Sequence, residues 1–255
     1  MSARSHASHV VDQFGAQASA YVTSAVHAAG ADLDRIGALI RGMPGSRALD
    51  LGCGGGHVAF AAAAAGATVT AYDLSTEMLA AVAAEAGRRG LDRIEIRPGA
   101  AESLPFADAA FDAVLTRYSA HHWRDVPAAL AEARRVLKPD GLLVVCDIAS
   151  PEEPLLDTHL QAVELLRDPS HVRDYRMSEW RRMLEAAGFA AGATLETRPR
   201  MEFASWIARM RTPPVNAAAI RALQAAAPEE VTAHFGIEAD GSFLIDSVLI
   251  EARPR

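Results

Sequence analysis

A glycine-rich stretch near residue 50 combines residue types that suit a nucleotide or nucleoside site. It reads Asp50-Leu51-Gly52-Cys53-Gly54-Gly55-Gly56 and lies between a short apolar run and an alanine-rich run. We expect a strand, a tight loop and a helix, in that order. Glycines permit positive φ and the close approach of a ligand, and the free N–H groups at the start of a helix bind a ligand placed beside them.

The glycine spacing is compatible with two classes of ligand. The G-x-G-x-x-G/A pattern of dinucleotide sites is met by Gly54, Gly56 and Ala59. A G-x-G-x-G pattern is also met, by Gly52, Gly54 and Gly56. Asp50 stands two residues ahead of this second pattern. Its carboxylate favours an ammonium or sulfonium group and repels a pyrophosphate.

A second carboxylate follows the next apolar run. Thr68–Asp73 is typical of a strand, and Asp73 ends it. The two oxygens of a carboxylate can accept hydrogen bonds from both hydroxyls of a ribose. Both ligand classes carry a ribose, so Asp73 does not separate them.

Two consecutive histidines, His121 and His122, follow an apolar run that is typical of a buried parallel strand. Histidine titrates near neutral pH and often acts as a general base. One of the pair could remove a proton from a substrate or donate a hydrogen bond to it; the alternative is that the pair only orders the loop. The nine histidines and two cysteines form no H-E-x-x-H motif or Cys/His cluster, so the sequence predicts no metal site.

Five motifs, taken in order, resemble those of class I S-adenosylmethionine-dependent methyltransferases, most closely the UbiE-like type. They are residues 49–56, residues 71–75 with Met78 and Leu79, residues 101–106, Phe111 and Asp112 with Val114, and residues 135–141. The resemblance covers roughly residues 14–147. A closer resemblance, to YafE-type bacterial methyltransferases, rests on residues 13–15, Tyr21, residues 24–27, 117–123 and 206–213.

The resemblance implies S-adenosylmethionine as cofactor, S-adenosylhomocysteine as product and in-line methyl transfer to a small-molecule acceptor. It implies a cofactor site made by Phe14, Tyr21, Asp50, Gly52, Cys53, Gly54, Gly56, Asp73, Leu74, Met78, Ala101, Glu102 and Arg117. Where many relatives carry an aspartate for the adenine amine, this chain has Ala100 and Ala101, so we expect the Ala101 backbone and Glu102 to serve instead. Two other functions stay open: an NAD(P)-dependent Rossmann oxidoreductase, and a non-catalytic S-adenosylmethionine-binding protein.

Alternating apolar runs and helical patterns predict an α/β fold with a doubly wound, mainly parallel sheet, whose ligands lie beyond the carboxyl ends of the strands. The resemblance implies seven strands with an antiparallel last one. Strands are expected at Arg47–Leu51, Thr68–Asp73, 94–97, 111–118, 142–148, from Thr194 onward and at 243–251, with a turn at 138–141. Helices are expected within 11–41 and at 56–65, 75–87, 126–137, 155–167, 178–187 and within 203–235.

We expect one structural domain with three parts. Residues 1–41 form a helical cap over the cofactor, residues 42–150 form the cofactor-binding core, and residues 151–255 complete the sheet and add a helical substrate lid at about 203–240. Substrate contacts are expected from Tyr118, His122, Trp206 and Arg209. Trp206 and Met210 could instead be the packing stripe of a helix, and Arg209 and Arg211 could bind an acidic group.

Composition limits the partners. The 255 residues carry 25 Lys+Arg against 32 Asp+Glu, a formal net charge of -7, which disfavours nucleic acid as a substrate. Cys53 and Cys146, the only cysteines, are expected to be reduced. Without a signal peptide or an apolar run long enough to span a bilayer, we expect a soluble, cytoplasmic protein. The sequence does not indicate an oligomeric state.

Overall fold

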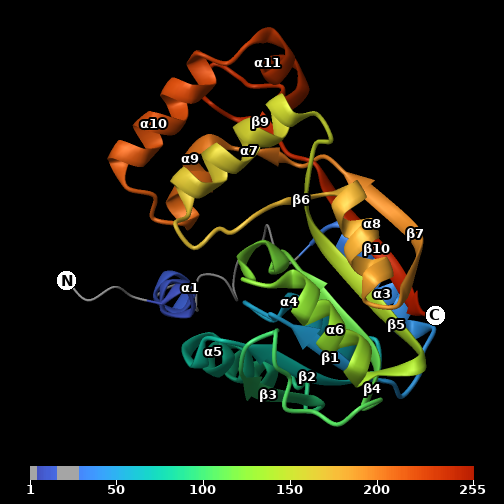
Figure 1. Ribbon diagram of the computed structural model, residues 1–255. Coiled ribbons are helices and arrows are strands. Elements are labelled where there is room, and N and C mark those ends of the chain that lie inside the picture. Colours follow the sequence, from blue (N-terminus) through green and yellow to red (C-terminus); the bar gives the residue numbers. More distant parts are fainter. Residues whose placement is uncertain (1–4, 16–28) are drawn as a thin grey trace.

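A central twisted sheet organises the computed structural model, which describes residues 5–15 and 29–255 (Figure 1). Its strands lie in the order β3-β2-β1-β4-β5-β10-β7. The first five are parallel, and β10 is antiparallel to both of its neighbours, β5 and β7. This confirms the predicted mainly parallel, seven-stranded sheet with an antiparallel last strand. Its members are β1 (Arg47–Leu51), β2 (Thr68–Asp73), β3 (Ile94–Pro98), β4 (Phe111–Arg117), β5 (Leu137–Ser150), β7 (Phe189–Thr197) and β10 (Ser247–Pro254).

Helices cover both faces of this sheet, each over its own apolar core. On one face α3 (Ala31–Arg41), α4 (His57–Ala64) and α5 (Thr76–Arg88) bury Ile, Ala, Val and Leu side chains against β1 and β2. On the other face α6 (Val126–Val136) and α8 (Met177–Ala186) pack against β4, β5 and β10. The central strands are apolar on both sides because both sides are covered.

A third layer lies beyond one end of the sheet, where β5 ends and the chain continues into α7 (Figure 1). It contains α7 (Pro154–Arg167), α9 (Phe203–Arg209), α10 (Pro214–Ala225), α11 (Glu229–Phe235) and the antiparallel pair β8 (Arg200–Met201) and β9 (Phe243–Leu244). Trp206, Ile220 and Phe235 are almost fully buried in its separate apolar core. The helical character predicted for residues 203–235 is therefore confirmed.

Several predicted boundaries are wrong. The expected strand at 243–251 is two strands, because β9 pairs with β8 and only β10, from Ser247, joins the main sheet. The expected turn at 138–141 belongs to β5, where the register shift between Phe111 and Ala113 of β4 accommodates the extra residues. β7 begins at Phe189 rather than Thr194, because the fully buried Phe189 pairs with the end of β10.

The N-terminal helix also differs from its prediction. We expected helix only from residue 11 onward, whereas α1 spans His6–Gly15. Short elements complete the described chain: the 3-10 turn η1 (Ala120–His122) follows β4, and β6 (Tyr175–Arg176) pairs with the end of β5. Residue Tyr21, a predicted cofactor contact, lies outside the described residues.

Candidate active site: two adjoining cavities

Two cavities of about 450 Å³ each lie side by side at the carboxyl ends of the parallel strands. We call the first the loop cavity, because the glycine loop at residues 52–55 forms part of its wall, and the other the second cavity. Both are large enough for a small organic ligand. Among the described residues, four line both cavities and thus form a shared wall: Phe14, Arg117, Tyr118 and His122.

The glycine loop adopts the backbone conformation that its sequence predicts. Gly52, Gly54 and Gly56 have φ values of 70°, 47° and 77°, in the left-handed region that favours glycine. A Cβ on Gly52 would lie 1.9 Å from the Ser119 hydroxyl oxygen, so only glycine lets the loop pass this close to the end of β4. Around Gly54 there is open space instead, on the side where a ligand would approach.

The two predicted carboxylates, Asp50 and Asp73, accept hydrogen bonds from backbone N–H groups in and near the glycine loop. Asp50 Oδ2 accepts a hydrogen bond of 2.9 Å from the Ala59 N–H in the first turn of α4. Asp73 accepts hydrogen bonds from the Gly54 N–H at 2.9 Å and the Ser75 N–H at 3.0 Å. Burial raises the pKa of Asp50 to about 7 and also raises the pKa of Asp73. Two desolvated carboxyl groups therefore line the loop cavity, where a cation or hydroxyl groups would stabilise their charged forms.

At the end of the loop cavity away from the glycine loop, Tyr72 makes hydrogen bonds to the backbone; the sequence did not predict it as a site residue. The Tyr72 hydroxyl donates to the carbonyl oxygens of Ala100 and Ser103, at 3.2 and 3.3 Å. Ala101 and Glu102 line the cavity as predicted, but Glu102 Oε1 already accepts a hydrogen bond from the Arg124 N–H. Tyr72 thus holds in place the backbone at residues 100–103, which would contact the flat ring of a bound ligand.

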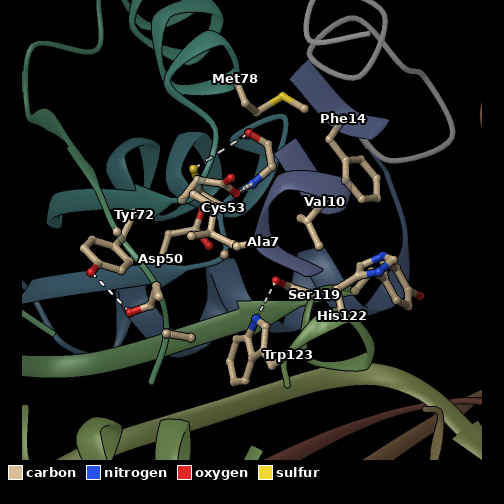
Figure 2. Close-up of a pocket in the computed structure, with 18 of the residues that line it drawn as sticks. Ala7, Val10, Phe14, Asp50, Cys53, Tyr72, Met78, Ser119, His122 and Trp123 are labelled. Carbon is tan, nitrogen blue, oxygen red and sulfur yellow. Dashed lines mark hydrogen bonds between the residues drawn. The ribbon is translucent and has the colours of Figure 1, made fainter. Parts of the chain in front are cut away.

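An apolar surface covers the remaining side. Figure 2 shows Ala7, Val10 and Phe14 of α1 facing the cavity on one side, with Met78, Cys53 and Asp50 on the others. His6 Nε2 lies 2.9 Å from the His122 carbonyl oxygen, and the Phe14 ring meets the His122 ring edge-on with centroids 5.0 Å apart. Helix α1 therefore contacts the shared wall. Leu74 also lines this cavity.

The shared wall contains a buried ion pair and a strained backbone. Arg117 Nε donates to Asp32 Oδ2 at 2.5 Å, and this pairing lowers the pKa of Asp32 although burial alone would raise it. The Arg117 guanidinium also lies 4.7 Å from the centre of the Tyr118 ring. Tyr118 has φ 51°, which is uncommon for a bulky residue, and its hydroxyl lies 3.2 Å from Ser247 Oγ. Strain of this kind concentrates at functional sites.

The two histidines differ sharply in charge. His121 Nδ1 lies 2.5 Å from Asp147 Oδ1. Burial alone would lower the pKa of His121, but the carboxylates around it, Asp147 foremost, raise it to about 9. For His122, burial and the charge of His121 lower the pKa to about 4. His122 is therefore neutral near physiological pH.

The position of His122 suits a proton acceptor. Its Nδ1 donates to the Ser170 carbonyl oxygen at 3.1 Å, which leaves Nε2 as the basic nitrogen of the neutral ring. His122 lines both cavities, whereas His121 lines only the second. The structure thus brings together His121 and His122, the two residues predicted as candidates for catalysis, but His121 is charged and His122 is neutral.

The second cavity combines an apolar surface with charges that pair among themselves. Arg167 pairs with Glu164 at 3.1 Å, and its guanidinium lies 4.8 Å from the centre of the Trp206 ring. Arg198 pairs with Asp246 at 2.6 Å. The predicted residues Trp206 and Arg209 both line this cavity, although Trp206 is also packed into the third layer and is 1% exposed. The apolar lining comes mostly from Ile148, Met201, Trp206, Met210 and Ile245.

Predicted residues outside the cavities have other surroundings. Arg211, considered for an acidic group, lines neither cavity within the described chain, and its Nη2 lies 3.5 Å from the Gln13 carbonyl oxygen. Gly56 caps α4 behind the loop and packs against Val82. Both cysteines are free and buried, as expected for reduced thiols.

Sequence reasoning assigned no role to Tyr72, Trp123 or Asp174, and for Ser119 and Asp147 it predicted only a place on the rim where ligands bind. Trp123 Nε1 donates to Ser119 Oγ at 3.1 Å, and both residues line the loop cavity. Asp147 and Asp174 converge on His121 from separate segments. The only signal for Asp147 in the sequence was its place at the end of a predicted strand, on the rim where ligands bind.

Comparison with known proteins identifies the family. Residues 49–145 match a family model described as a methyltransferase domain. YafE of Escherichia coli, described as an uncharacterized protein, is 48% identical over 77% of this chain and 95% of its own length. The chain belongs to the class I methyltransferase family. YcgJ of Bacillus subtilis, described as an uncharacterized methyltransferase, is 36% identical over 78% of this chain and 79% of its own length.

The crystal structure of YcgJ superposes on this methyltransferase with a TM-score of 0.82 at 33% identity, covering 87% of this chain and 99% of YcgJ. The chain is thus an S-adenosylmethionine-dependent methyltransferase, and the oxidoreductase interpretation of its glycine loop is set aside. In the described part of this methyltransferase no helix has the length and apolar character needed to cross a membrane.

Proposed function

We propose that S-adenosylmethionine binds in the loop cavity, that a small-molecule acceptor binds in the second cavity, and that the methyl group passes between them. The observation that carries this proposal is the wall that the two cavities share, at Phe14, Arg117, Tyr118 and His122. An in-line displacement needs donor and acceptor to meet end to end with water excluded. Two small-molecule cavities that meet at one wall supply that arrangement.

The residues of the loop cavity fit the proposed cofactor. Asp50 and Asp73 are buried carboxyl groups that a cationic ligand and ribose hydroxyls would stabilise. Gly54 has no Cβ and has open space beside it, so a ligand can approach its backbone. The backbone at Ala100 and Ala101, held by Tyr72, supplies polar atoms for an adenine.

The protein itself has to supply little chemical activation for methyl transfer. When bound, S-adenosylmethionine supplies a methyl group already activated by its sulfonium charge. Phe14 and Tyr118 form an aromatic surface that excludes water and orients the acceptor at the shared wall. His122 is neutral, and its Nε2 would accept a hydrogen bond or a proton from the acceptor; its pKa, lowered to about 4, makes it a weak base, which suits an acceptor with an acidic proton. His121 is charged through its pairing with Asp147 and is a hydrogen-bond donor rather than a base.

The second cavity favours a partly apolar organic acceptor. Ile148, Met201 and Met210 offer an apolar surface, while the cationic side chains Arg167 and Arg198 are paired with carboxylates of this chain. An acceptor with a large negative charge would have to displace those pairs. The formal net charge of -7 also argues against a nucleic-acid acceptor. A cytoplasmic location stays a prediction.

The test uses one change in each cavity. S-adenosylhomocysteine is expected to raise the melting temperature of the protein, and NADH is not. Asp73→Ala should remove most of that shift. Met201→Trp, which narrows the second cavity, should keep the shift and abolish methyl transfer from radiolabelled S-adenosylmethionine to a panel of phenols, quinols, amines and acidic carbon compounds. If Met201→Trp removed the cofactor shift, or Asp73→Ala left it unchanged, the assignment of the cavities would be wrong.

A further inference from the structure

A buried cluster of potential metal ligands lies at the floor of the second cavity. His121 comes from η1, Asp147 from near the end of β5, and Asp174 from the segment that joins α7 to β6. One ligand atom from each lies within 4.8 Å of the other two. Asp147 and Asp174 are 2% and 1% exposed. Three distant segments thus bring two buried carboxylates together with one partly exposed imidazole.

Asp174 is the unusual member of this cluster. Both of its carboxylate oxygens are buried without a hydrogen-bond partner. Native proteins rarely leave such groups unsatisfied, because a buried polar group without a hydrogen-bond partner is destabilising. The oxygens lie in the cluster with His121 and Asp147, so the missing partner belongs at the same point.

Among the described residues, the neighbouring cations donate no hydrogen bond to the Asp174 carboxyl group, and the charged His121 makes its short contact with Asp147 instead. Arg173 pairs with Asp157 and Glu179, both at 3.1 Å. Arg167 pairs with Glu164. His171 Nε2 stays 3.9 Å from Asp174 Oδ2 and lies 3.1 Å from Gln161 Oε1 instead.

We propose that His121, Asp147 and Asp174 bind a divalent transition-metal ion such as Zn²⁺ or Mn²⁺. An imidazole with two carboxylates is a donor set that these ions accept, whereas Mg²⁺ prefers oxygen ligands alone. Because a metal ion binds only the neutral imidazole, the proton that His121 carries beside Asp147 is released to solvent on binding, and the short contact between the two residues opens, since ligand atoms around one such ion lie roughly 3 Å apart. Three protein ligands leave at least one coordination position open, as in catalytic zinc sites.

The open position faces the second cavity. His121 and Asp174 both line that cavity, next to Glu164. An oxygen or nitrogen atom of a bound acceptor can therefore complete the coordination sphere, and the metal would orient the acceptor toward the shared wall. This consequence depends on the proposed function, whereas metal binding itself does not.

The test measures metal binding without methyl transfer. Untagged protein is treated with a chelator, dialysed and titrated with Zn²⁺, Mn²⁺ and Mg²⁺ by calorimetry, and with Co²⁺ by visible absorption. We expect binding at one equivalent of Zn²⁺ and Co²⁺, a d–d spectrum typical of mixed nitrogen and oxygen ligation, and much weaker binding of Mg²⁺. Asp174→Asn should weaken Zn²⁺ binding by roughly a hundredfold or more.

Two controls keep the result interpretable. His159→Gln changes a histidine of α7 whose ring packs against Phe235 in the third layer, and it should bind Zn²⁺ as the parent does. The melting-temperature shift with S-adenosylhomocysteine reports whether Asp174→Asn is folded, because Asp174 does not line the loop cavity. Equal Zn²⁺ affinity in the parent and Asp174→Asn, or no Zn²⁺ binding by a parent that responds to S-adenosylhomocysteine, would overturn the metal site. Metal binding without any such response would instead contradict the proposed function.

Discussion

The loop cavity and the second cavity have the same volume and share a wall, but they are built in opposite ways. The loop cavity is formed by turns at the ends of neighbouring parallel strands. The carboxylates of Asp50 and Asp73 accept hydrogen bonds from backbone N–H groups there. The second cavity is assembled from α3, η1, β5, α7, β8 and α9, and two ion pairs at it join separate segments, Asp32 of α3 with Arg117 of β4 and Arg198 with Asp246. Backbone geometry thus defines the first, and side chains from distant segments define the second.

This difference teaches where ligand specificity is set. A site held by backbone turns changes little when surrounding residues change, which suits a ligand common to a whole family. A site held by side-chain pairs on separate elements can be altered one residue at a time. We infer that the acceptor of this methyltransferase is set by the second cavity and its cofactor by the first.

The largest expected effect comes from the wall that the cavities share. His122→Gln removes the neutral imidazole and should lower kcat by roughly a hundredfold or more for an acceptor that must lose a proton. The affinity for S-adenosylhomocysteine, measured by calorimetry, should change little. His159→Gln serves as the matched control and should keep full turnover. A His122→Gln variant with normal kcat would show that this side chain moves no proton.

The next effect concerns the loop cavity alone. Asp73→Ala removes an acceptor for the Gly54 and Ser75 N–H groups and for the proposed ribose hydroxyls. Each lost hydrogen bond to a charged group is worth about 1.5–3 kcal/mol, so the Kd for S-adenosylhomocysteine should rise roughly tenfold to several hundredfold. Asp92→Ala, an exposed carboxylate before β3, should leave the Kd unchanged.

A pH dependence separates the two cavities further. Burial raises the pKa of Asp50 to about 7, so its carboxyl group is ionised above that pH and mostly protonated below it. A cationic ligand binds the ionised form, and the Kd for S-adenosylmethionine should therefore rise as the pH falls from about 8 to about 6, by at most tenfold per pH unit. Calorimetry in two buffers of different ionisation enthalpy should detect proton release on binding at about pH 6.5. Asp50→Asn should abolish both effects; a pH-independent Kd in the parent would remove Asp50 from contact with the cation.

The smallest expected effect is at the adenine end. Tyr72→Phe deletes a hydroxyl that bonds the carbonyl oxygens of Ala100 and Ser103. A neutral hydrogen bond contributes about 1 kcal/mol, so the Kd for S-adenosylhomocysteine should rise several-fold, with kcat at saturating cofactor preserved. Tyr175→Phe is a control at a tyrosine that lines neither cavity. Equal Kd values for Tyr72→Phe and the parent would mean that this backbone does not position the ligand.

The sequence predicted the loop cavity far better than the second cavity, for a physical reason. The bounds of β1 and β2 and the positive φ of the loop glycines follow from neighbouring residues, and the structure confirms each of them. The second cavity depends on pairings between residues that are far apart in sequence. The ion pair between Asp32 and Arg117 is an example, because no local sequence pattern predicts it.

The His121 cluster shows the same limit more sharply. A search for compact metal motifs predicts none, because His121, Asp147 and Asp174 meet only after three segments fold together. The break between β9 and β10 was missed for a similar reason, since the short partner strand β8 lies more than forty residues earlier. The roles assigned to the site residues, and the division into cap, core and lid, stay predictions.

The most direct test of the two-cavity account is a crystal structure with S-adenosylhomocysteine bound. The account predicts the ribose hydroxyls on Asp73, the adenine against the backbone at residues 100–101, and the sulfur atom facing the shared wall beside Tyr118 and His122. A sulfur atom that points away from that wall, or a ligand seated in the second cavity instead, would contradict the account.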